Sequence, residues 1–475
     1  MLFVATKTLQ HHVEPNLRTP LIEQLQEKGL IPLVRSARLH AYELALPGTD
    51  RARELERALD AQTTDAGEAP YVRGDLFCFE DFIHFLLFND EAGEDAALRA
   101  GIIYEADTSV PQQKLEAFCR NVYEAIEAAR GFSDLKAASA LLETEWQAHT
   151  AETPEAFAQF AADAADDAAS ANVRSSMVAD WLRVAGMLED TEARQVLRRQ
   201  VEAQQEGRGA AALVGSETVS ESLLTRLAGA GLVKREVLVS CRKDGRPLFR
   251  LPSPDALGVL NASNAICTEC GATIADEKAD EITVPTSLTT TLLQDGSWLT
   301  THLRSILVKL GLPEEQIVAR PVSGEGESRA MAHVAGETFL FLLRDGDWTA
   351  TDARRALDEQ TQTGAQHAVL IATGKIHEEV RQRLREHARR RAHGRGAADV
   401  LFIEGMEAVT PELQKTFAHV AAEALNEELW PLDASLGTSA AQFIAARFRL
   451  LQKTTPLREL AASAAGALAG SLREF

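Results

Sequence analysis

The spacing of hydrophobic residues predicts alternating strands and helices in the first 110 residues. Short apolar runs between turn residues indicate strands at Met1–Thr6, Gly29–Val34 and Ala41–Leu46, and a helix at Leu21–Glu27. The segment Phe77–Phe88 is too apolar to face water, so we expect it in a core. Residues 1–110 are therefore predicted to form an α/β domain, whose role the sequence leaves unassigned.

The pattern becomes helical from residue 111 to about residue 205. Behind Pro111, one stripe at the spacing of a helix face is formed by Leu115, Phe118, Val122 and Ile126. The segment Ala156–Ala171 is rich in Ala and Asp and indicates an exposed helix or a helical linker. Residues 111–205 are predicted to be a helical region. Cys78 and Cys119 lie among apolar residues and are expected in the core.

Residues 206–297 show a different order of elements: helix, glycine turn, strand, hairpin and strand. The hairpin turn is Lys243–Arg246, in which Asp-Gly favours the positive φ angles of a tight turn. This order resembles a winged helix, in which a helix enters a groove of nucleic acid and the wing contacts phosphates. Winged helices also serve as protein-interaction modules, and this helix is poor in Arg and Lys. Both functions stay open.

The same region carries a candidate metal site. Cys267 and Cys270 stand in a Cys-x-x-Cys-Gly motif, and Cys241 and Asp244 form a similar motif with Asp as its second member. The combined pattern resembles a zinc ribbon with one replaced ligand. Zinc accepts carboxylate oxygen, so three thiolates and one carboxylate form a chemically valid structural zinc site. The alternative is a relic ribbon that has kept its hairpins and lost the metal.

The segment Trp298–Val409 predicts a helix, a strand, a hairpin, a second helix and the buried strand His367–Thr373, followed by a helix that starts at Ile376. This order resembles the restriction-endonuclease-like fold, and most closely its Mrr-type branch. In that branch the last apolar strand ends in a Thr-Thr or Thr-Gly pair, which Thr373 and Gly374 match. The resemblance covers about 110 residues, and its motifs are low in specificity.

The resemblance implies an acid on one strand and an (E/D/Q)-x-K motif on the next, which hold a divalent metal ion. Phe341 and Leu343 stand at the two positions of that motif, so the resemblance implies a degenerate nuclease. The alternative is an active metal-dependent nuclease with a migrated site. Its candidate residues are Glu325, Glu327, Asp345 and Asp347.

A run of arginines follows the last apolar strand, with seven of them between Arg381 and Arg395. Guanidinium groups suit bidentate contacts to phosphate. The candidate nucleic-acid-binding residues are Lys375, Arg381, Arg385, Arg389, Arg390 and Arg391. The alternative is a solvated helix face that carboxylates of another domain neutralise.

The net charge of −21 excludes general coating of DNA or of an anionic membrane, so any nucleic-acid contact must be local. The sequence contains no apolar run long enough for a membrane span, and its five cysteines do not suggest a disulfide framework. We therefore expect a cytoplasmic protein.

The whole pattern predicts an α/β multidomain protein with segments 1–110, 111–205, 206–297, 298–410 and 411–475. The last segment consists of C-terminal helices, of which residues 461–472 are rich in Ala. We expect a nucleic-acid-binding or sensing component of a bacterial defence or restriction-type assembly, with DNA and other proteins as partners. That expectation rests on the family resemblance. A second alternative is a protein-interaction scaffold that does not bind nucleic acid.

Overall fold

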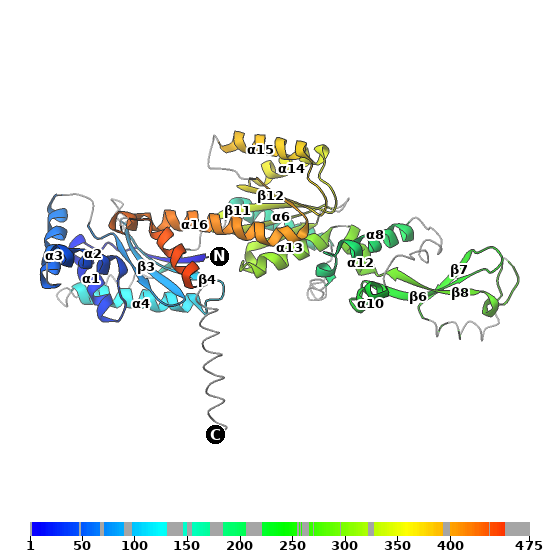
Figure 1. Ribbon diagram of the computed structural model, residues 1–475, viewed down its shortest axis with the longest axis horizontal. Coiled ribbons are helices and arrows are strands. Elements are labelled where there is room, and N and C mark those ends of the chain that lie inside the picture. The colour runs from blue at the N-terminus through cyan, green and yellow to red at the C-terminus, as the bar shows by residue number, and fades with distance from the viewer. Residues whose placement is uncertain are drawn as a thin grey trace, which may run out of the picture. The chain divides into compact units, whose positions relative to one another are not determined.

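A computed structural model of the chain describes residues 2–46, 49–66, 71–89, 97–130, 146–149, 154–171, 184–205, 221–253, 256, 258, 266–268, 270–294, 296–321, 327–392, 400–436 and 438–451. These residues form helices and three β-sheets, which confirms the α/β class (Figure 1). The chain divides into two compact units. One comprises Met1–Thr153, Val334–Gly336 and Leu413–Phe475, and the other comprises Pro154–His333 and Glu337–Glu412. The five segments expected from the sequence remain predictions.

The first unit is built on an antiparallel sheet with the strand order β2-β3-β4-β1-β5. Its strands are β1 (Leu2–Leu9), β2 (Gly74–Cys78), β3 (Phe82–Asn89), β4 (Ala97–Glu105) and β5 (Gln147–His149). The β2–β3 hairpin is largely buried, as the apolar run in the sequence predicted.

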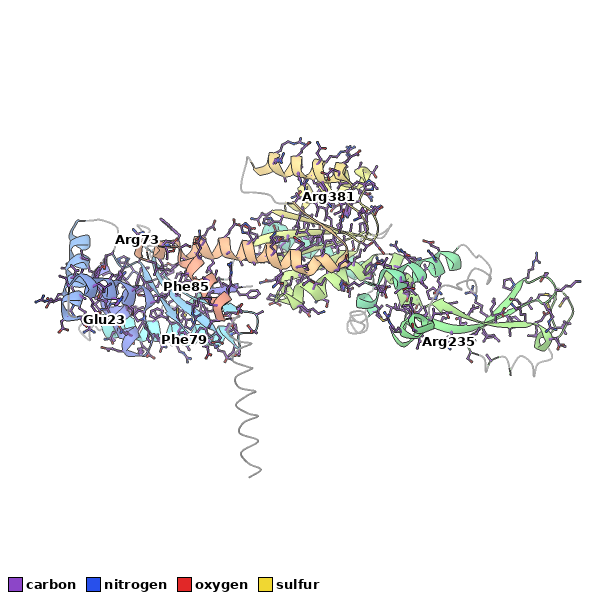
Figure 2. The ribbon with its side chains drawn as sticks, in the orientation of Figure 1. Glu23, Arg73, Phe79, Phe85, Arg235 and Arg381 are labelled. Carbon is purple, nitrogen blue, oxygen red and sulfur yellow. The ribbon has the colours of Figure 1, made fainter. Side chains whose placement is uncertain are left out.

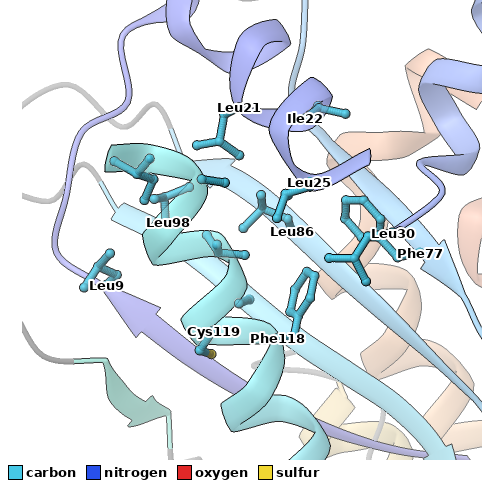
Figure 3. Close-up of a cluster of buried hydrophobic side chains, with 14 of the residues drawn as sticks. Leu9, Leu21, Ile22, Leu25, Leu30, Phe77, Leu86, Leu98, Phe118 and Cys119 are labelled. Carbon is cyan, nitrogen blue, oxygen red and sulfur yellow. The ribbon is translucent and has the colours of Figure 1, made fainter. Parts of the chain in front are cut away.

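Helices cover both faces of this sheet. On one face α1 (Pro15–Glu27) and α4 (Pro111–Arg130) bury a cluster that includes Leu25, Phe77 and Phe118 (Figure 3). The buried cluster of the other face takes side chains from α2 (Leu33–Ala45), α16 (Val409–Leu436) and residues 440–451. The remaining helix, α3 (Thr49–Ala66), packs on α1 and α2.

Two of the strand predictions near the N-terminus are wrong. The segment Gly29–Val34 contains an isolated bridge at Pro32 and the first two residues of helix α2, and Ala41–Leu46 belongs largely to the same helix. The carboxylate of Asp75 accepts hydrogen bonds from the N–H groups of Val34 and Arg35, in the first turn of that helix. A cap supplied by a distant strand is invisible in a local hydrophobic pattern, and short apolar runs suit either element.

The apolar stripe predicted for α4 is confirmed, because its four residues Leu115, Phe118, Val122 and Ile126 are all buried. Cys119, on the same helix, is also buried, as expected. Cys78 is exposed, which corrects the expectation that it lies in the core. It is the last residue of β2, where the strand leaves the covered part of the sheet.

The main sheet of the second unit has the strand order β13-β12-β11-β10-β9. Its strands are β9 (Ile317–Pro321), β10 (Glu327–Val334), β11 (Glu337–Arg344), β12 (His367–Ala372) and β13 (Val400–Glu404). Strands β11, β12 and β13 are parallel, whereas β9 and β10 are antiparallel. Every residue of β12 is buried, as expected of a strand inside a parallel sheet.

Helices flank this sheet in the order that the sequence predicted: α13 (Ser297–Lys309), α14 (Ala350–Thr363) and α15 (Glu378–Ala392). Helix α6 (Glu155–Ala171) packs on the sheet through Phe157 and Phe160, which share a buried cluster with residues of α14 and α15. The expected exposed helix at Ala156–Ala171 therefore has one buried face. These two phenylalanines are enough to attach an otherwise Ala-rich helix.

A smaller antiparallel sheet in the second unit has the strand order β7-β6-β8. It consists of β6 (Val233–Ser240), β7 (Pro247–Leu251) and β8 (Lys278–Pro285), drawn in green in Figure 1. Nearby helices are α8 (Thr191–Gln205), α10 (Glu221–Gly229) and α12 (Ser287–Gln294). The order helix, strand, hairpin and strand agrees with the sequence pattern, and the winged helix itself remains a prediction.

Among the helices that the structure describes, none combines the length and the hydropathy needed to cross a bilayer. The Ala-rich helix predicted at residues 461–472 lies outside the described residues.

Candidate metal centre and arginine-rich helix

Four side chains of the second unit bring potential metal ligands together: Cys241, Cys267, Cys270 and Glu277. Their ligand atoms all lie within 4.8 Å of one another. Cys241, Cys267 and Glu277 are buried, and Cys270 is partly buried. Within the described parts of the chain, no other group of three or more His, Cys, Asp or Glu side chains meets at this distance. Three of the four metal ligands expected from the sequence thus lie together.

Two turns with the same backbone geometry carry the cysteines. In the first, the N–H of Gly245 donates to the carbonyl of Cys241 at 2.8 Å, and in the second the N–H of Gly271 donates to the carbonyl of Cys267 at 2.9 Å. Both glycines have positive φ, 72° and 75°, where a side chain would be strained. The sequence forms two equivalent turns because each has glycine four residues after its first cysteine.

Glu277 completes the cluster from the residue just before β8. Its carboxylate accepts hydrogen bonds from the thiol of Cys270 at 2.8 Å and from the backbone N–H of Arg242. The bond to Glu277 raises the pKa of the Cys270 thiol to about 12, and it lowers the pKa of Glu277. The carboxylate is therefore held in its charged form beside the three sulfur atoms.

Asp244, the fourth ligand expected from the sequence, is not a member of the cluster. Its side chain is exposed, and its Oδ1 accepts the backbone N–H of Arg246 at 3.0 Å. This bond is the largest cause of the lowered pKa of Asp244, and a hydrogen bond with the Cys241 thiol is the second. The sequence motif correctly predicted that Asp244 lies in the first cysteine turn. Its side chain, however, accepts a backbone N–H of that turn. The structure replaces Asp244 with Glu277 as the fourth member.

Carboxylates also gather at the carboxyl end of the parallel strands in the main sheet. Asp345, directly after β11, is buried and forms ion pairs with Arg194 and Arg198 of α8. Its carboxylate also accepts hydrogen bonds from Trp298 Nε1 at 3.3 Å and from the Thr373 hydroxyl at 2.7 Å. Asp345 is thus an internal anchor that joins α8 and α13 to the sheet.

The other acidic residues proposed for a migrated nuclease site do not form a cluster of free carboxylates in the part of the chain that the structure describes. Glu327, the first residue of β10, pairs with Arg344 of β11 and with Arg355 of α14. Asp347 is exposed and accepts the backbone N–H of Lys375 at 2.7 Å. Glu325 lies outside the described residues. Phe341 and Leu343 are fully buried within β11, so neither position supplies a polar group.

The arginines of α15 fall into two groups. Arg381, labelled in Figure 2, belongs to helix α15. It donates to Glu404 at 2.9 Å and to the carbonyl of Ile376 at 3.2 Å, and it lies over the ring of Phe402. Glu404 accepts the N–H of Ile376, and this bond, together with Arg381, lowers its pKa. Arg381 therefore holds the start of α15 to the end of β13.

The second group faces solvent. Arg383, Arg385, Arg389 and Arg390 are exposed. Arg385 lies over the ring of Phe402 and approaches Glu378 only to 3.7 Å. Lys375 is also exposed, with its Nζ 3.5 Å from Glu404. The side chain of Arg391 lies outside the described residues. The arginine row is thus a mixture of one structural arginine and several solvent-facing ones.

Comparison with models of protein families, with curated proteins and with solved structures finds no match. Function is therefore inferred from the geometry of this chain.

Three residues of these sites were not found by sequence reasoning: Glu277, Arg344 and Glu404. The only signal for Glu277 was its position among several acids after Cys270, and the spacing did not distinguish them. Arg344 and Glu404 end their strands, where parallel strands bring distant residues to one edge. That edge becomes visible only when the strand order is known.

The anchoring role of Asp345 predicts a stability effect. Replacing Asp345 with Ala leaves two arginines without their shared buried partner, so we expect the second unit to lose about 3–5 kcal/mol of unfolding free energy. The matched variant Asp347→Ala removes one exposed hydrogen bond and is expected to cost about 1 kcal/mol. Urea unfolding of both variants measures the difference. Equal losses would show that Asp345 is not the anchor.

Proposed function

We propose that this protein binds nucleic acid without cleaving it, as a binding or sensing component of a defence or restriction-type assembly. The observation that carries the proposal is the set of exposed arginines on α15, which at 3.6 residues per turn form two pairs on its solvent side: Arg385 with Arg389, and Arg383 with Arg390. The order of helices and strands from α13 to α15 agrees with the restriction-endonuclease-like resemblance and supports the same assignment. The assembly itself is proposed from that resemblance alone.

The local reversal of charge is the physical basis of this proposal. The chain carries a net charge of −21, so its overall field repels phosphate. Exposed guanidinium groups on one helix form a local positive surface that pairs with phosphates through bidentate hydrogen bonds. Such contacts supply affinity and little base specificity, because phosphates are the same at every sequence position.

The ion pairs at the edge of the main sheet support the proposal that the protein does not cleave nucleic acid. Metal-dependent hydrolysis of a phosphodiester needs carboxylates that hold a hard divalent cation and activate water. Glu327 is instead paired with two arginines, and Asp345 is buried among Arg194, Arg198 and Trp298. A guanidinium group at each carboxylate neutralises the charge that would attract the cation. This arrangement favours binding over hydrolysis.

We expect the purified protein to leave plasmid DNA and single-stranded DNA intact with Mg²⁺ or Mn²⁺. Agarose and denaturing gels measure nicking and cutting over a time course. Cleavage that disappears in a Glu327→Ala variant would contradict this expectation and would favour the migrated nuclease site.

The arginine row predicts a defined loss of DNA affinity. Replacing Arg385, Arg389 and Arg390 with Glu should weaken binding to unrelated duplex sequences by similar factors. The slope of log affinity against log salt should fall by roughly 0.9 for each phosphate that the protein no longer neutralises. Gel-shift titrations at several salt concentrations measure both quantities. Arg381 is excluded from this set because it pairs with Glu404.

The matched control makes the same three Arg-to-Glu replacements on a different helix. Arg51, Arg53 and Arg57 are exposed on α3, and their replacement with Glu alters the net charge equally. This control should bind DNA with an affinity close to that of the unmodified protein. Equal losses in both triple variants would assign the effect to net charge. Absence of DNA and RNA binding by the unmodified protein would reject the proposal in favour of a protein-interaction scaffold.

We further propose that the cysteine cluster binds a structural zinc ion. Thiolates are soft ligands that zinc prefers, and a tetrahedral zinc with bonds of about 2.3 Å places sulfur atoms about 3.8 Å apart. The ligand atoms already lie within 4.8 Å of one another, so metal binding requires only small shifts of these side chains. When bound, the ion cross-links the two cysteine turns and the start of β8.

Elemental analysis of the purified protein should give about one equivalent of zinc per chain, because four ligands form one tetrahedral site. A Cys267→Ser variant should lose the metal. Cys119 is buried in the other unit and is absent from the cluster, so Cys119→Ser should keep it. Metal-free unmodified protein, or equal zinc content in both variants, would reject the zinc proposal.

A further inference from the structure

We infer that Glu277, and not Asp244, is the fourth ligand of a three-thiolate, one-carboxylate zinc site. This inference rests on the proposed zinc binding and adds to it the identity of the ligand that the sequence motif misassigned. It also gives the metal a specific task, which is to tie the start of β8 to the first cysteine turn.

The register of the sheet brings Glu277 to the metal position. Ser240, the last residue of β6, pairs with Lys278, the first residue of β8. Cys241 and Glu277 are the next residues beyond this pair and therefore continue side by side past the ends of both strands. The backbone N–H of Arg242 donates to the Glu277 carboxylate and fixes its direction. A buried, oriented carboxylate next to three sulfur atoms is a preorganised ligand.

The contact between Glu277 and Cys270 indicates where the ion would enter. The proton of the Cys270 thiol lies between the two side chains, in a 2.8 Å hydrogen bond that Cys270 donates to Glu277. In a tetrahedral zinc site a sulfur and an oxygen ligand lie about 3.5 Å apart. The ion would take the place of the thiol proton, which is released to solvent, and the distance between the two ligand atoms would increase by less than about 1 Å. Asp244 lies outside the group of four, and to reach the ion it would have to give up its bonds to the N–H of Arg246 and to the Cys241 thiol.

The small core around the cluster explains why an ion is needed there. The buried residues of this part are Val239, Cys241, Cys267 and Ile274, so two of the four are the cysteines themselves. The other apolar side chains that pack against this cluster, Leu248, Phe249 and Leu251, are only partly buried. A zinc ion coordinated by Cys241, by the cysteines of the second turn and by Glu277 would supply a cross-link that this core lacks. In structural zinc sites of this kind, metal binding is coupled to folding.

Zinc affinity of the full chain, measured by competition with a chromophoric chelator, tests the ligand assignment. Glu277→Gln keeps an acceptor for the N–H of Arg242 and removes the charged ligand. Loss of an outer contact to a metal ligand costs roughly 10–100-fold in affinity, so loss of the ligand should exceed about 100-fold. Asp244→Asn is the matched control, one carboxylate converted to its amide; because Asp244 contacts the Cys241 thiol from outside the group of four, it should change affinity by less than about 100-fold.

Cobalt(II) absorption gives a second measurement that is independent of affinity. Cobalt(II) bound to the unmodified protein should show charge transfer from three thiolates. Glu277→Cys should raise this absorbance by about a third, because a fourth thiolate joins the metal. Asp244→Cys should leave the absorbance of the bound metal unchanged. Amide hydrogen exchange in β12 confirms for each variant that the main sheet is folded.

The possible results separate the two proposals. If Asp244→Asn weakens zinc binding more than 100-fold and Glu277→Gln does not, the ligand assignment is wrong and the zinc proposal stands. The same conclusion follows if Asp244→Cys raises the cobalt absorbance and Glu277→Cys does not. If the unmodified protein binds neither zinc nor cobalt, the zinc proposal and this inference both fail.

Discussion

Pairing of carboxylates with arginines at one edge of the main sheet is the interaction on which the second unit depends. Asp345 joins α8 through Arg194 and Arg198, and Glu404 holds α15 through Arg381. Because β11, β12 and β13 are parallel, these acids reach the same end of the sheet. The ion pairs fix the surrounding helices and compensate the negative charge of Asp345 and Glu404.

The carboxylates at the edge of the main sheet and the cysteines of the cluster lie in different parts of the second unit. Oxygen ligands at the sheet are balanced by guanidinium groups, whereas the soft sulfur ligands lie in the small β7-β6-β8 module. A proposed zinc ion would therefore stabilise structure there and take no part in hydrolysis. The exposed arginines of α15, which we propose contact phosphate, lie on the helix that the Arg381–Glu404 pair holds in place.

The sequence predicted much of the secondary structure and less of the sites. The elements between Trp298 and Thr373 agree with the structure because long apolar periodicities determine them. The strand predicted at Ala41–Leu46 failed because α2 receives its cap from Asp75, more than 30 residues away in the chain. Three cysteines were found from their motifs, but Glu277 depends on the β6–β8 register. Local residue spacing predicts the two cysteine turns. Only the β6–β8 register shows which carboxylate lies next to the cysteines.

X-ray absorption at the zinc edge of the purified full chain tests the central claim most directly, because it reports the atoms around the metal. We predict one zinc environment with three sulfur atoms at about 2.3 Å and one oxygen atom at about 2.0–2.2 Å. A shell of oxygen and nitrogen atoms without sulfur would contradict it, since zinc would then lie away from Cys241, Cys267 and Cys270.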